Sequence, residues 1–195
     1  MKNTKKITIS GIIAVIVLAL LVALDQWTKQ LAVQHLAGQP DIPLIKDILV
    51  LHYLENTGAA FGLLQNKGWI FIVFTLMFLL FGGYLFAKMP KTKRYIPLYI
   101  IIVFLLAGAI GNLIDRMLHA YVIDFIYFVP INFPVFNIAD MYVSVSAAIL
   151  ILLIIFFYKD EDFAFMNQKS DEQLESDESE SATVSDDDSD VEETI

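Results

Sequence analysis

The chain of 195 residues contains no cysteine. This absence excludes disulfides, thiol catalysis, thiolate metal sites and a lipid-attachment cysteine. Charge is also scarce over most of the chain, because residues 1–158 hold only seven acids and eleven bases, whereas residues 159–195 hold 15 acids and two bases. The formal net charge of −9 therefore reflects one acidic tail. A segment so charged and so poor in apolar side chains is expected to be disordered.

The residue sets of several common types of catalytic site are absent as well. The three histidines lack the HExxH spacing of a zinc hydrolase, and GAIGN at 108–112 lacks the lysine of a phosphate-binding loop. Ser144 and Ser146 have no Lys or His nearby to serve as a base, so helix packing explains them better. Carboxylates are the reactive groups that remain.

Apolar sequence is what the chain has in abundance. Hydrophobic residues make up 57% of it and the mean hydropathy is +0.63, which exceeds the usual range of a soluble domain. Four apolar runs of 18 or 19 residues occupy 7–24, 69–87, 96–114 and 141–158. At about 1.5 Å per helical residue, each run is long enough to cross the bilayer core of roughly 30 Å. The sequence therefore predicts four transmembrane helices.

Basic residues predict the orientation. The first apolar run follows three lysines and could be a cleavable signal peptide, but it is long and lacks a small-x-small site before Asp25, which favours an uncleaved anchor. The loop KMPKTKR at 88–94 carries four more basic residues. Both basic regions should face the cytoplasm, and so should the C-terminal tail after an even number of spans. Residues 25–68 and 115–140 then lie on the outer side.

The first outer segment has two patterns. DQWTKQLAVQHL at 25–36 predicts a short amphipathic helix lying in the membrane interface. Beyond it, residues 40–64 mix proline, β-branched residues and glycine, which indicates short strands and turns. The predicted fold is therefore an all-α membrane protein with a small β element: four transmembrane helices, an extracytoplasmic cradle of short strands and an interfacial helix. No internal repeat typical of an inverted-repeat transporter is visible.

Four acids lie at or near the ends of spans, where a charge still needs a partner: Asp25, Asp115, Asp124 and Asp140. Each has an ordinary structural interpretation. Asp140 would cap the fourth helix, Asp115 would pair with the adjacent Arg116, and Asp25 would pair with Lys29 one helical turn later.

Polar neighbours weaken these ordinary interpretations. Asn112, Asp115 and Arg116 share one helical face, Asn137 precedes Asp140 by three residues, and Asn56 adds an amide on the same side of the membrane. Two carboxylates placed close together do not both ionise readily, so such a pair shares a proton. One member can then take a proton from water while the other polarises a carbonyl, without a metal or a cofactor.

Five blocks carry a family resemblance: DQWTK (25–29), ENTGAAFG (55–62), GAIGNLIDR (108–116), VIDF (122–125) and FNIAD (136–140). In order and spacing they resemble the signature blocks of lipoprotein signal peptidase, or signal peptidase II, over residues 7–158. The resemblance implies an aspartyl endopeptidase of the bacterial cytoplasmic membrane. Such an enzyme removes the signal peptide of a prolipoprotein by cutting before the diacylglyceryl-modified cysteine.

The resemblance also implies roles for residues. Asp124 and Asp140 match the catalytic pair. Eight further residues match positions that line or brace the site: Asp25, Lys29, Asn56, Gly108, Asn112, Asp115, Arg116 and Asn137. Of these, Asn56 and Arg116 are expected to contact the substrate backbone.

The expected partners are the prolipoprotein and membrane lipid, with no nucleic acid, metal or cofactor, and the protein is expected to act as a monomer. The small residues Gly108, Ala109 and Gly111 would let a substrate helix approach closely, and ordinary helix packing is the alternative for the two glycines. Two other function classes are a carrier that uses the acids as a proton relay and a non-enzymatic assembly factor. The position of the acids near one membrane face, and not at mid-membrane, counts against a relay.

Overall fold

The computed structural model describes residues 2–58 and 68–166, with side chains from residue 11 onward. The chain divides into two compact units, residues 1–153 and residues 154–195. The first unit contains most of the helices and the whole sheet.

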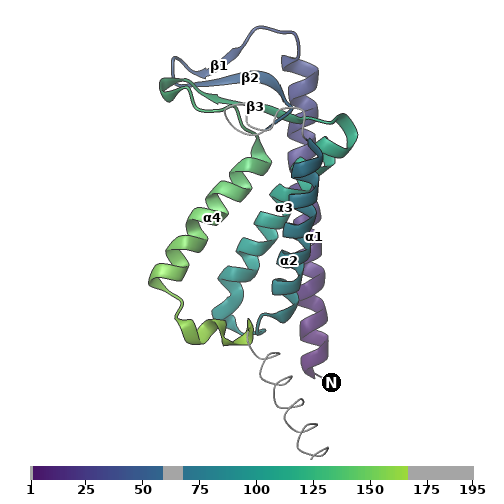
Figure 1. Cartoon of the computed structure of the whole chain (residues 1–195), viewed down its shortest axis with the longest axis vertical. Helices are drawn as coiled ribbons and strands as arrows, with labels where there is room; N and C mark the ends of the chain where they lie inside the picture. Colours follow the sequence, from purple (N-terminus) through teal and green to yellow (C-terminus); the bar gives the residue numbers. More distant parts are fainter. Residues whose placement is uncertain (1, 59–67, 167–195) are drawn as a thin grey trace, which may run out of the picture. The chain divides into compact units, whose positions relative to one another are not determined.

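Four helices are long and apolar enough to cross a membrane: α1 (Lys2–Leu36), α2 (Gly68–Lys88), α3 (Ile96–His119) and α4 (Ile138–Phe156) (Figure 1). The prediction of four transmembrane helices is confirmed. Both α1 and α2 pack against α3. The third helix follows a short 3-10 turn, η2 (Lys93–Tyr95), and runs five residues beyond its predicted end.

The first helix differs from its prediction. Residues 25–36 are helical as predicted, but they continue α1 without a break and do not form a separate interfacial helix. No proline or glycine occurs between Leu24 and Leu36, and most residues there are good helix formers, so the helix propagates. It ends at Leu36, whose carbonyl accepts a hydrogen bond from the N–H of Gln39 at 3.0 Å. Gly38 supplies the left-handed turn with φ 68°.

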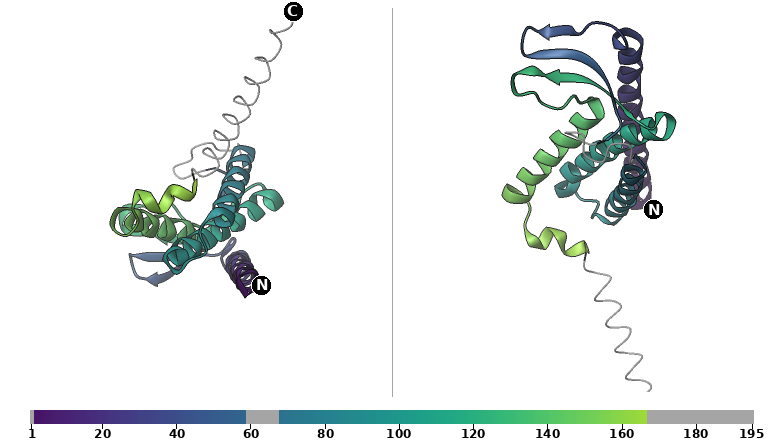
Figure 2. Two further views of the ribbon diagram at one scale, coloured as in Figure 1. Left: turned by 90° about the horizontal axis from the view of Figure 1, so that it is seen from below. Right: turned by 45° about the horizontal axis from the view of Figure 1, so that its top comes forward.

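A small antiparallel sheet confirms the predicted β element. Its strand order is β1 (Ile42–Ile45), β2 (Leu49–Asn56), β3 (Val122–Phe128). The right-hand view of Figure 2 shows the three strands lying side by side. The third strand comes from VIDFIYF, after α3, and was not among the predicted strands. The sheet therefore joins two distant parts of the chain.

The sheet packs on the last turns of α1. Ala32 and Leu36 form a buried cluster with Ile123 and Phe125 of β3. This contact fixes β3 against α1, because burial of apolar surface is the main favourable term available at this junction.

A register shift in β2, between Leu51 and Leu54, sets which side chains face one another. Beyond the shift, Leu54 pairs with Asp124 and Asn56 pairs with Val122. Because alternate residues of a strand share a face, Asn56 and Asp124 are diagonal neighbours on one face of the sheet.

The second unit contains a short 3-10 helix, η4 (Asp160–Met166). The ring of Tyr158 contacts Phe157 and Phe163, with centroids 5.0 and 5.9 Å away. The carboxylate of Asp162 accepts a hydrogen bond from the N–H of Lys159 at 2.9 Å. These contacts order the first residues of the segment for which disorder was expected. Residues 167–195 of the predicted tail lie outside the described residues.

Candidate active site

Buried polar side chains gather where α1, α3, β3 and α4 meet. Five of them are 1% exposed or less: Asp25, Lys29, Asp115, Asp124 and Asn137. Hydrogen bonds join them to Asn56, Asn112 and Asp140. Eight of the ten residues assigned to the site from the sequence thus form one network, and Gly108 and Arg116 border it. In the described part of the chain, every buried polar side-chain atom has a partner.

The start of α4 places the last aspartate of the network. The helix begins at Ile138, so Asp140 is its third residue, and Asn137 takes the capping position that the ordinary interpretation gave to Asp140. The side-chain oxygen of Asn137 accepts the N–H of Asp140 at 3.0 Å, and the Asp140 carboxylate accepts the N–H of Asn137 at 3.1 Å. This reciprocal pair of hydrogen bonds is a capping box, which fixes the Asp140 side chain at the N-terminus of α4.

Amide groups donate hydrogen bonds to the carboxylate of Asp124 and to that of Asp140. Asp124 accepts a hydrogen bond from the side-chain amide of Asn137 at 2.7 Å on Oδ1 and another from Asn56 at 2.8 Å on Oδ2. Asp140 accepts one from the side-chain amide of Asn112 at 2.7 Å on Oδ1 and the backbone N–H of Asn137 on Oδ2. Each of the four oxygens therefore accepts one N–H, and a carboxylate oxygen can accept two.

Burial makes the charge of Asp124 costly. Burial is the larger cause and the neighbouring charge of Asp140 the second, and together they raise the pKa of Asp124 from its ordinary value to about 7. Hydrogen bonds from Asn56 and Asn137, and the positive charge of Lys29, act in the opposite direction. Burial and like-charge repulsion prevail, so Asp124 exchanges its proton close to neutral pH.

Lys29, Asp25 and Asp115 form an ion cluster that adjoins this pair of acids. The ammonium of Lys29 is 2.9 Å from Asp25, 2.9 Å from Asp115 and 2.9 Å from the side-chain oxygen of Asn112. Three acceptors thus match the three donors of an ammonium group. The predicted pair of Asp25 with Lys29 is present, whereas Asp115 pairs with Lys29 of α1 and not with its sequence neighbour Arg116.

The carboxylates of the ion cluster also bind backbone. Asp25 accepts the N–H of Ala139 at 3.0 Å, near the start of α4, and Asp115 accepts the N–H of Ile123 at 3.0 Å, in β3. These two bonds attach α1 to α4 and α3 to β3, so the ion cluster fixes the two elements that carry Asp124 and Asp140.

Gln26 is a member of the network that sequence reasoning missed. Its side-chain amide donates to Asp115 at 2.9 Å, to Asp25 at 3.2 Å and to the carbonyl of Gly111 at 3.1 Å. The signal was its place inside the DQWTK block, next to a boundary acid.

The two glycines of α3 serve packing within the protein. A Cβ added to Gly108 would lie 2.5 Å from the carbonyl oxygen of Ala139 and 2.7 Å from a methyl group of Val143. A Cβ on Gly111 would overlap the carboxylate of Asp25. The packing interpretation of both glycines therefore prevails over close approach of a substrate helix.

Arg116 lies at the border of the network and is half-buried. Its Nη1 is 3.4 Å from the carbonyl oxygen of Asn112, and its guanidinium carbon is 4.8 Å from the ring centroid of Phe71. Its charge attracts the carboxylates of Asp140 and Asp124. The cation thus faces the pair of acids without a direct ion pair to either.

Comparisons with known proteins decide the family. The model of the family described as signal peptidase (SPase) II matches residues 17–156. The chain belongs to the signal peptidase II family. A lipoprotein signal peptidase of Brevibacillus brevis is 39% identical over 135 residues, which cover 69% of this chain and 89% of the relative. One of Caldanaerobacter subterraneus subsp. tengcongensis is 45% identical over 138 residues, covering 70% and 92%.

Solved structures share the fold of this chain. Two structures of a bacterial membrane enzyme match with TM-scores of 0.65 and 0.66, each at 29% identity. They cover 73% and 74% of this chain, and 87% and 94% of the solved chains. The family resemblance inferred from the sequence is confirmed. The chain is a bacterial membrane protein of a protease family that processes the signal peptides of prolipoproteins.

Proposed function

We propose that Asp124 and Asp140 are the catalytic pair that hydrolyses the peptide bond before the diacylglyceryl-modified cysteine of a prolipoprotein. One observation carries the proposal: Asn137 donates its side-chain amide to Asp124 and its backbone N–H to Asp140, which brings the two carboxylates together. Like charges so placed do not both ionise readily, so the pair holds one proton near neutral pH.

The reaction needs only water and the pair. The ionised carboxylate takes a proton from water as the water oxygen bonds to the peptide carbonyl carbon, and the protonated carboxyl gives its proton to the carbonyl oxygen. The resulting diol then collapses. The first carboxyl protonates the leaving nitrogen as the C–N bond breaks, and the diol returns a proton to the second carboxylate. The pair again holds one proton.

The amides supply orientation. The side-chain amides of Asn56, Asn112 and Asn137 and the backbone N–H of Asn137 each bind one of the four carboxylate oxygens. They leave further lone pairs for the shared proton and the water. Pre-set hydrogen bonds of this kind reduce the reorganisation needed during the reaction.

Two residues extend the proposal to the substrate. An arginine has five N–H donors and an asparagine amide has two, so Arg116 and Asn56 can donate to the substrate backbone beside the pair. Hydrogen bonds from these two side chains to the substrate backbone would hold an extended peptide beside the two acids.

The membrane arrangement is also a proposal. The termini and the loop at 88–95 face the cytoplasm, the pair lies near the outer leaflet, and the enzyme acts as a monomer. The lysine clusters of the sequence support this orientation. A site near the span ends meets a membrane-anchored substrate without drawing it out of the bilayer. The tail at 159–195 would then lie away from the chemistry.

An assay with purified protein in detergent and a diacylglyceryl-modified prolipoprotein tests the proposal. Wild type should release the signal peptide, and Asp124→Asn and Asp140→Asn should each lose at least about 10²-fold in rate, since each removes an acid–base group. Both variants should remain folded, because Asn is close in size to Asp. Near-normal cleavage by both folded variants would refute the catalytic pair.

A further inference from the structure

Phe71 of α2 contacts a residue at the border of the site. Its ring centroid lies 4.8 Å from the guanidinium carbon of Arg116 on α3. We propose that Phe71 is a positioning residue, whose ring face holds the guanidinium of Arg116 beside Asp140 and Asp124 during peptide hydrolysis. This inference rests on the proposed catalytic pair.

Arg116 is weakly held by its own helix. Its hydrogen bond to the carbonyl of Asn112, one turn earlier in α3, is long at 3.4 Å. The face of the Phe71 ring is a second contact of the guanidinium, and the charges of nearby carboxylates also attract it. An aromatic face attracts a cation within about 6 Å, and it does so more strongly when water is excluded. The ring therefore supplies the restraint that the long hydrogen bond does not.

The other charged groups near the pair are already fixed. Lys29 of α1 binds Asp25 and Asp115 as well as Asn112, so its distance from the pair is set by an ion cluster. Arg116 is the second cation that acts on Asp140. Its place depends on a side chain from a different helix. Through Phe71, α2 thus contributes to a site whose other groups come from α1, α3, the sheet and α4.

The chemistry gives this contact a measurable consequence. A cation close to two carboxylates favours their ionised forms. Without the ring, the guanidinium of Arg116 is free to turn away, and the pair keeps its proton to higher pH. The alkaline limb of the pH–rate profile should then move to higher pH. The rate below that limb should fall, because the proposed hydrogen bonds of Arg116 to the substrate backbone are lost.

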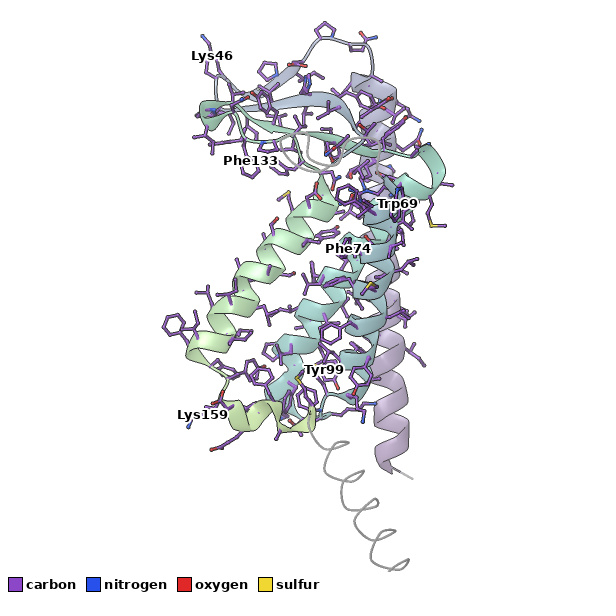
Figure 3. All side chains as sticks on the ribbon, viewed as in Figure 1. Lys46, Trp69, Phe74, Tyr99, Phe133 and Lys159 are labelled. Carbon is purple, nitrogen blue, oxygen red and sulfur yellow. The ribbon has the colours of Figure 1, made fainter. Side chains whose placement is uncertain are left out.

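Three variants separate positioning from bulk. Phe71→Leu keeps apolar volume and removes the ring, Phe71→Tyr keeps the ring, and Phe74→Leu is a matched control on the same helix, where Phe74 is 65% exposed (Figure 3). With a diacylglyceryl-modified prolipoprotein in detergent, Phe71→Leu should lower kcat/KM about 2- to 30-fold at about pH 6, below the alkaline limb, which is the range of a cation–aromatic contact. Phe71→Tyr and Phe74→Leu should stay within about twofold of wild type.

A double-mutant cycle gives the decisive readout. If Phe71 acts through Arg116, Phe71→Leu should cost little further activity in an Arg116→Gln background. If Phe71→Leu lowers kcat/KM equally in the wild-type and Arg116→Gln backgrounds, the inference is overturned. It is also overturned if Phe71→Leu cleaves at the wild-type rate, or if the alkaline limb of its pH–rate profile does not move. If Phe71→Leu does not fold, Phe71→Met takes its place with the same expectations.

The outcome is separable from that of the catalytic pair. If Asp124→Asn and Asp140→Asn are inactive and Phe71→Leu cleaves at the wild-type rate, only the role of Phe71 is refuted. Active Asp→Asn proteins would refute the pair itself.

Discussion

The side-chain amide of Asn137 donates a 2.7 Å hydrogen bond to the carboxylate of Asp124, thirteen residues earlier in the chain. The same residue caps α4 through its side-chain oxygen, which accepts the N–H of Asp140. One asparagine therefore does two things: it starts the helix that carries one acid, and it orients the other acid.

Substitutions at Asn137 can separate these two tasks. Serine is a good helix cap but has no amide to donate to Asp124, whereas alanine lacks both groups. We expect Asn137→Ser to be more stable than Asn137→Ala by about 0.5–2 kcal/mol, the usual value of a cap. Both should lose most of their cleavage rate. Thermal unfolding in detergent and the prolipoprotein assay measure the two effects. Full activity in Asn137→Ser would show that the amide is unnecessary.

Gly111 tests the packing of α3 against the ion cluster. A methyl group at this position would overlap the carboxylate of Asp25 and lie 3.3 Å from the Cβ of Ala139. Gly111→Ala should therefore destabilise the protein by about 1–3 kcal/mol, the usual cost of overpacking, and reduce cleavage. Gly83 of α2 is the matched control, since a Cβ there meets nothing within 4 Å.

The control should behave differently. Gly83→Ala should leave cleavage unchanged and should stabilise α2 slightly, because alanine is a better helix former than glycine. Thermal unfolding of both variants in detergent checks the contrast. Equal stability of the two alanine variants would contradict the role assigned to Gly111.

Local signals account for the parts of the fold that were predicted. The length of an apolar run is a property of neighbouring residues, and it located the four helices. The strand β3 was missed because VIDFIYF becomes a strand only when β2 is beside it, more than sixty residues away in the chain. The continuity of α1 was missed because the amphipathic pattern at 25–36 was given more weight than the absence of a helix breaker.

The site shows the same division. The boundary acids and their amide neighbours were found because charge is rare in this chain. Their partners were not predictable, since Asp115 could pair with the adjacent Arg116 or with a residue of another helix. The structure pairs Asp115 with Lys29 of α1. Phe71 carried no signal, because one phenylalanine among the 15 of the chain looks like a packing residue until its contact with Arg116 is seen.

The absence of cysteine makes the orientation simple to test. Single cysteines near Lys91 and near Lys46 can be labelled in intact cells with a reagent that does not cross the membrane. We expect the cysteine near Lys46, in the turn between β1 and β2, to react from outside and the one near Lys91 to react only after permeabilisation. The reverse pattern would place the acid pair on the cytoplasmic side.

The last prediction concerns pH. Burial, and secondly the charge of Asp140, raise the pKa of Asp124 to about 7, so the pair should lose its shared proton as the pH rises through this value. We expect kcat/KM to decline above about pH 7, measured from pH 5 to 9 in one detergent.

The free energy of unfolding should also depend on the protonation of Asp124, and it should decrease as the pH rises. A carboxyl whose folded pKa is raised binds more protons in the folded state than in the unfolded state, between its ordinary pKa and about 7. The contribution of Asp124 to the free energy of unfolding is therefore greatest below this window and declines as the pH rises to about 7. Asp124→Asn cannot titrate, so its unfolding temperature should fall less than that of wild type between pH 4 and 7. Parallel curves for the two proteins would mean that Asp124 does not titrate in this range.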